Sequence, residues 1–106
     1  MDEGKFRKLV EEAIDSLPEE FKKRLNNISV VVDDSPGVPL FGLYQGSPQT
    51  KRGFYSGVLP DKITIFKKSI EQVARTEEEI KAQVRATVIH EIGHHFGLSE
   101  HDLRNF

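Results

Sequence analysis

One stretch of the sequence predicts the longest helix of the chain: Thr76-Glu-Glu-Glu-Ile-Lys-Ala-Gln-Val-Arg-Ala-Thr-Val-Ile-His-Glu-Ile-Gly-His-His-Phe-Gly97. Thr76 and Glu79 have the spacing of a capping box, in which a Thr hydroxyl and a Glu carboxylate each accept a hydrogen bond from the other residue's backbone amide. We expect the helix to cover roughly residues 77–96. Gly97 can end it, because glycine readily adopts the left-handed conformation found after a helix.

The second half of this helix has an unusual distribution of charge. Between Ala86 and Gly93 the only formally charged residue is Glu91. We expect this apolar turn to be buried, and an unpaired buried carboxylate is costly. A divalent cation or a metal-bound water beside Glu91 would remove that cost.

The segment His90-Glu-Ile-Gly-His94 is an HExxH motif on a predicted helix. His90 and His94 lie one turn apart on the same face, so both imidazoles can bind one zinc ion at about 2.0–2.1 Å. Glu91 is turned about 100° away, where its carboxylate can hold a water molecule at an open coordination position. Zinc lowers the pKa of such a water to about 7, and Glu91 can take its proton as the water attacks a carbonyl carbon. The motif therefore predicts metal-assisted hydrolysis with Glu91 as the general base.

A third zinc ligand must come from outside the helix, and a chain reversal at Gly97 would return residues 98–101 to the metal. Glu100 has the spacing of the third ligand in the extended metzincin pattern HExxHxxGxxH, and His101 follows it. We expect Glu100 to be the ligand, with His101 as the alternative. The chain lacks the methionine turn of metzincins, because its only methionine is Met1.

The rest of the chain predicts an α+β fold. Apolar residues three and four apart predict a helix over residues 3–16, and a second short helix follows from Pro18 to Leu25. Strands are predicted for Ile28–Asp33, Phe41–Gln45 and Lys62–Phe66, a long loop for Gly46–Pro60 and a short helix for residues 67–74.

The composition limits the classes of function. The 106 residues fit one domain, carry a net charge of −2 and include no cysteine. The near-balance of charge argues against a nucleic-acid or membrane-surface partner, and a metal would have to be held by His and carboxylates. No stretch resembles a signal peptide or a membrane span, so we expect the protein in the cytoplasm, most plausibly of a bacterium.

The segment Arg85-Ala-Thr-Val-Ile-His-Glu-Ile-Gly-His-His-Phe-Gly-Leu-Ser-Glu100 resembles the small bacterial zincin-like metallopeptidases. The resemblance extends over nearly the whole chain and includes Leu17-Pro-Glu-Glu-Phe21, Gly42-Leu-Tyr44 and Val58-Leu-Pro-Asp-Lys-Ile-Thr64. It implies a single minimal zincin domain over residues 1–106, with a small mixed sheet on the active-site helix and N-terminal helices beside it. The HExxH motif itself predicts a zinc cofactor, and the small size of the chain predicts a shallow cleft and therefore a peptide or flexible protein segment as substrate. Members of the family carry an acidic residue at the place of Glu100, which supports that residue as the third ligand.

Some alternatives stay open. The site could belong to a zinc-stabilised binding module that cleaves nothing, in which His101 would close the fourth coordination position. Glu91 favours an enzyme, because a purely structural site needs no general base. Tyr44 and Tyr55 are candidates for stabilising an oxyanion, with ordinary packing as the alternative. We expect His95 to be a packed core histidine.

Overall fold

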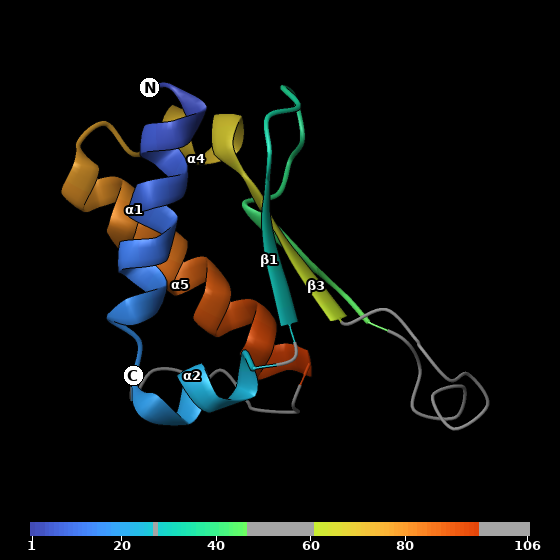
Figure 1. The fold of residues 1–106 in the computed structure, drawn as a ribbon. Helices are drawn as coiled ribbons and strands as arrows, with labels where there is room; N and C mark the ends of the chain where they lie inside the picture. The colour runs from blue at the N-terminus through green and yellow to red at the C-terminus, as the bar shows by residue number, and fades with distance from the viewer. Residues whose placement is uncertain (27, 47–60, 96–106) are drawn as a thin grey trace.

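The computed structural model describes residues 1–26, 28–46 and 61–95, apart from the side chain of His95. It has the predicted α+β architecture (Figure 1). The elements in chain order are α1 (Glu3–Asp15), α2 (Glu19–Arg24), β1 (Ile28–Asp33), β2 (Gly42–Gln45), β3 (Asp61–Phe66), α4 (Lys67–Val73) and α5 (Glu77–His95).

The three strands form a mixed sheet in the order β1-β3-β2. β1 runs parallel to β3, with Ile28 opposite Asp61, and β2 runs antiparallel to β3, with Gly42 opposite Ile65. The central strand supplies Ile63 and Ile65, which are fully buried. β2 is therefore an edge strand of this sheet, and it lies on the side that approaches α5.

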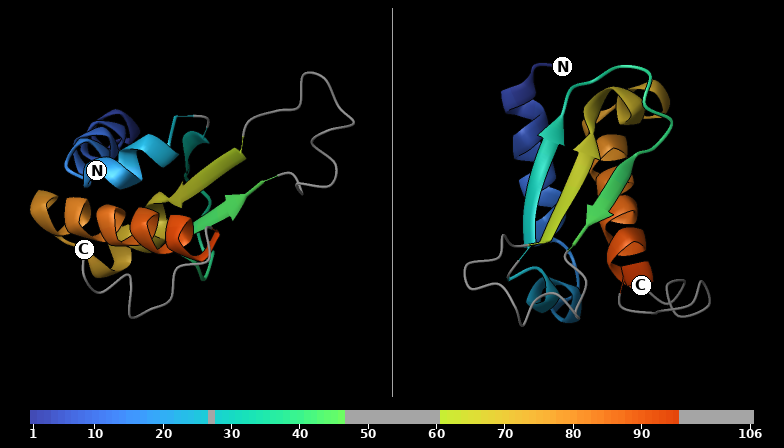
Figure 2. Two further views of the ribbon diagram at one scale, coloured as in Figure 1. Left: turned by 90° about the horizontal axis from the view of Figure 1, so that it is seen from below. Right: turned by 90° about the vertical axis from the view of Figure 1, so that its right-hand side faces the viewer.

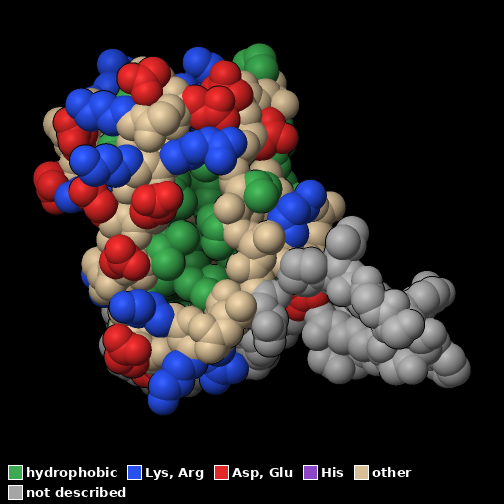
Figure 3. Space-filling model, in the orientation of Figure 1, with side chains coloured by type: hydrophobic (Ala, Val, Ile, Leu, Met, Phe, Trp, Pro, Cys, Tyr) green, Lys and Arg blue, Asp and Glu red, His purple; other side chains and the backbone are tan. Residues whose placement is uncertain are grey.

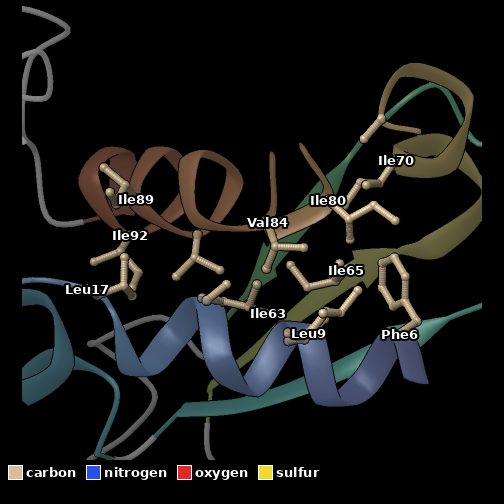
Figure 4. Close-up of a cluster of buried hydrophobic side chains, with 14 of the residues drawn as sticks. Phe6, Leu9, Leu17, Ile63, Ile65, Ile70, Ile80, Val84, Ile89 and Ile92 are labelled. Atoms are coloured by element: carbon tan, nitrogen blue, oxygen red, sulfur yellow. The ribbon is translucent and has the colours of Figure 1, made fainter. Parts of the chain in front are cut away.

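Helices α1 and α5 pack against each other and cover one face of the sheet (Figure 2, right). The apolar residues of α5 recur every fourth position, so they form one stripe along the helix. Figure 4 shows this stripe directed at α1 and at the central strand. Its members are Ile80, Val84, Val88 and Ile92, and all four are buried.

The core is thin at its margin between α1 and β1. Figure 3 shows apolar side chains reaching the surface there, in a hollow framed by charged residues. The half-buried apolar residues that pack against the core include Ile14 on α1 and Val30 and Val32 on β1. A core of this kind leaves a modest stability margin, as expected for a domain of this size.

Of the two hydrogen bonds predicted for the cap of α5, one is confirmed and the other has a different donor. Thr76 Oγ1 accepts a hydrogen bond from the backbone N–H of Glu79 at 3.1 Å, as the capping box requires. The carboxylate of Glu79 accepts instead from the N–H of Arg75 at 2.9 Å, one residue before the expected donor. The helix nevertheless begins at Glu77, as predicted. Each of the two side chains still accepts a hydrogen bond from a backbone amide at this end of the helix.

A buried lysine anchors α4. The side chain of Lys67 is only 3% exposed, and its ammonium lies 3.0 Å from a Glu71 carboxylate oxygen and 3.6 Å from one of Asp34. Burial acts to raise the pKa of Glu71, but the hydrogen bonds from Lys67 and the N-terminal amine outweigh it, so this pKa lies below its ordinary value of 4.5. Burial likewise opposes the charge on Lys67, yet Glu71 and Asp34 keep its pKa above the ordinary value.

Candidate metal centre

The last turns of α5 place His90, Glu91 and His94 on the outer side of the helix. Val88 and Ile92 occupy the inner stripe and are fully buried. With 3.6 residues per turn, positions 90 and 94 fall outside that stripe, and both histidines are exposed. The same periodicity that builds the core thus brings the two imidazoles to the surface.

The rings of His90 and His94 face each other through their Nε2 atoms. These two nitrogens lie 2.9 Å apart, the ring centroids are 4.3 Å apart, and the ring planes meet at 73°. In the absence of a cation, one ring donates and the other accepts, according to the tautomer. Two nitrogens bound to zinc at tetrahedral angles would lie about 3.3–3.4 Å apart, so a small rotation of the side chains suffices. The pair therefore fits a shared zinc ion.

The expectation of a buried carboxylate is wrong. Glu91 is half-buried, and its neighbours His90 and His94 are exposed. The near-absence of charge between Ala86 and Gly93 suggested burial, and Ile89, Ile92 and Gly93 are indeed buried. The polar residues of this turn lie together on its outer side. The carboxylate of Glu91 is therefore not fully buried, and its burial does not by itself require a cation beside it. The convergence of the two imidazoles is the stronger argument for a metal.

A groove of about 370 Å³ leads to these residues. One wall is the segment from Pro39 to Gly42, and the floor is the outer side of α5, with Gln83, Ala86, Thr87, His90 and Glu91. Leu40 and Phe41 are 47% and 37% exposed. These wall residues are absent from the predicted site, since their one local signal in the sequence is a pair of large apolar side chains beside Pro39.

The groove is narrow at its base because Gly42 lies directly against Thr87. A Cβ atom at position 42 would come within 2.6 Å of Thr87 Cγ2. The Thr87 hydroxyl donates to the carbonyl oxygen of Gln83 at 2.7 Å and accepts from the Gln83 side-chain amide at 3.3 Å. The two hydrogen bonds hold the Thr87 side chain on α5, and the contact with Gly42 limits how closely β2 can approach α5.

Tyr44 is tied to the neighbouring strand. Its hydroxyl donates to the carboxylate of Asp61 at 2.6 Å, and its ring packs against the core cluster. Packing and the hydrogen bond to Asp61 account for the position of this side chain. Tyr55, the other oxyanion candidate, lies outside the described residues.

Comparison with known proteins identifies the family. The family profile of the zincin-like metallopeptidases matches residues 15–106, which include β2, the groove wall and all of α5. The chain belongs to the zincin-like metallopeptidase family. Its zincin-like fold is also similar to the solved structure of a conserved hypothetical protein from Thermus thermophilus, with a TM-score of 0.56 and 26% identity. That alignment covers 91% of this chain and 94% of the other. No protein of curated function matches the chain.

Zincin-like metallopeptidases normally bind zinc, and this suggests a zinc peptidase role for the chain. Within residues 1–26, 28–46 and 61–95 no third His, Cys, Asp or Glu joins the histidine pair in a group able to hold a metal. Glu100 and His101, the two expected third ligands, lie outside the described residues, as do Gly97 and the side chain of His95. Among the helices of the described part, none combines the length and apolar character needed to cross a membrane.

Proposed function

We propose that the chain is a zinc-dependent peptidase that hydrolyses peptide bonds, with His90, His94 and Glu100 as zinc ligands and Glu91 as general base. One observation carries this proposal. His90 and His94 turn their Nε2 atoms toward each other, 2.9 Å apart, and His90 lines a groove together with Glu91. In a member of the zincin-like metallopeptidase family, this arrangement is that of a metal site open to a substrate.

Metal binding and proton transfer are assigned to different residues of the proposed site. Bound zinc would supply a Lewis acid that lowers the pKa of a water molecule. His90 and His94 would hold the ion from one rigid helix, and Glu100 would approach it from the chain beyond α5. Glu91 is half-buried at the groove, where its carboxylate can take a proton from water and donate it to the departing amine.

The groove supports a peptide or a flexible protein segment as the substrate. Its wall is continuous with β2, an edge strand, and an extended peptide can pair with the backbone of such an edge. Neither a nucleic acid nor a membrane belongs to the proposed activity. Action in the bacterial cytoplasm is part of the same proposal.

The test is the variant Glu91→Gln, because it removes the base and leaves both imidazoles in place. We expect zinc content and melting temperature to stay unchanged while hydrolysis of a quenched fluorescent peptide falls about 10²–10⁴-fold. Glu78→Gln is the matched control, because Glu78 is a highly exposed residue of the same helix. Loss of zinc from the Glu91 variant, or full residual activity, would remove Glu91 from the role of base. A zinc-loaded wild-type protein that hydrolyses no peptide would favour the non-catalytic binding module instead.

A further inference from the structure

We infer that the groove beside Glu91 is a subsite for a large apolar side chain, and that the protein cleaves internal bonds of extended segments that carry such a residue. This inference rests on the proposed function and adds the class of substrate to it. Its starting point is the exposure of Leu40 and Phe41, two large apolar side chains on the wall of the groove.

The chemistry of the lining favours an apolar occupant. Pro39, Leu40 and Phe41 form the wall, and Ala86 lies on the floor. The polar floor residues Gln83 and Thr87 bond to each other, so an apolar side chain above them leaves that pair satisfied. The volume of about 370 Å³ is at the small end of ligand pockets, which suits one or two side chains rather than a large ligand.

The charges of the groove disfavour the free C-terminus of a chain as the bound group. No Lys or Arg is among the described residues that line it, and its ionisable groups are His90 and Glu91. The terminal carboxylate of a peptide would thus meet no basic side chain along the wall and would approach the carboxylate of Glu91. An uncharged internal segment avoids both the unpaired carboxylate and its repulsion by Glu91.

The length of the groove sets the number of substrate residues. Gln83 and Glu91 are eight positions apart on α5, which corresponds to about 12 Å along the helix. An extended peptide advances about 3.3 Å per residue, so the groove accommodates three to four residues on one side of the cleaved bond. The apolar residue is therefore expected within that distance of the bond.

Binding can be measured apart from cleavage with the zinc-loaded Glu91→Gln protein. End-blocked ten-residue peptides would differ only in a single Leu or Ala, placed at each position in turn, and fluorescence anisotropy would follow their binding. We expect Leu at a position within the groove to tighten binding about tenfold over Ala, from burial of its side chain. The variant Leu40→Asp should reduce this preference to less than about twofold.

Leu43→Asp provides the matched control. Leu43 is as exposed as Phe41, at 37%, but it alternates with Gly42 along β2 and so faces away from α5. We expect this variant to keep the preference for Leu. Equal effects of the Leu40 and Leu43 variants, or binding indifferent to Leu, would overturn the inference.

Hydrolysis by the wild-type protein separates this inference from the proposed function. Cleavage of internal bonds that follows the same Leu preference supports both. Cleavage that ignores Leu overturns the apolar subsite, and removal of single residues from the C-terminus overturns the preference for internal bonds; either result is compatible with peptidase activity. A zinc-loaded wild-type protein that binds peptides with the Leu preference but cleaves none of them supports the apolar subsite and refutes the proposed peptidase activity.

Discussion

The contact between Gly42 and Thr87 predicts that Gly42→Ala destabilises the fold. A Cβ atom at position 42 would lie 2.6 Å from Thr87 Cγ2 and 3.1 Å from the carbonyl oxygen of Thr64. Both threonines are buried, at 6% and 7% exposure, so neither can move aside into solvent. β2 must instead shift away from α5, and overpacking of this kind costs about 1–3 kcal/mol.

For a domain of this size, about 2 kcal/mol corresponds to a fall of roughly 10 °C in Tm. Urea unfolding followed by circular dichroism gives the change in free energy directly. A second substitution, Thr87→Ser, removes Cγ2 and keeps the hydroxyl that bonds to Gln83. We expect the double variant to recover about 1 kcal/mol relative to the sum of the single variants, because the two groups are in contact. The recovery should be partial, since the contact with Thr64 remains.

Gly37→Ala is the control for this pair. Gly37 has a φ of +79° and no atom within 4 Å of a Cβ built on it, so its substitution costs stability through the backbone alone. Thr87→Ser should not rescue it. The reasoning is refuted if Gly42→Ala is as stable as wild type, or if Thr87→Ser rescues both glycine variants equally.

Three further predictions concern the metal and the charges. Chelation should lower the Tm measured by calorimetry, because zinc at a hundred times its Kd contributes about 2.7 kcal/mol to the folded state; an unchanged curve for verified apo protein would contradict this. Glu100→Ala should weaken zinc binding in a competition titration more than His101→Ala does, and the reverse order would assign the ligand to His101. The lowered pKa of Glu71 gives stability that is fully present above about pH 4.5 and is lost as the pH falls through the folded value. Glu71→Gln should reduce the loss of unfolding free energy between pH 5 and pH 2, measured by urea unfolding at each pH. A loss as steep as in the wild type would exclude this ion pair as its source.

Local sequence signals predicted the elements well where they were unambiguous. The β-branched run Ile28–Asp33 forms a strand with the predicted bounds, because such residues favour extended backbone and Asn and Pro residues flank the run. Pro18 was expected to open α2, but it precedes the helix, which begins at Glu19. The difference is small, because the fixed φ of proline suits the first position of a helix and the one before it.

The parts that depend on tertiary packing were not predictable in the same way. The pairing of β1 with β3 joins strands far apart in the sequence, and no local pattern gives their order. The same holds for the groove, whose wall around Leu40 and floor at Gln83 meet only once β2 packs on α5. In the candidate site, spacing alone placed His90 and His94 one turn apart. The scarcity of charge between Ala86 and Gly93 misjudged the exposure of His90 and Glu91, because it does not show which side of the helix each residue occupies.

Core and candidate site are two sides of the same helix. Val84, Val88 and Ile92 hold α5 against α1 and the sheet, and the helical repeat then fixes where His90 and His94 emerge. The 2.9 Å approach of the two imidazoles is set by their one-turn spacing on a single helix rather than by a loop. A metal that binds both imidazoles favours the helical conformation of this turn. Zinc binding and folding are therefore expected to stabilise each other in a domain whose core is this thin.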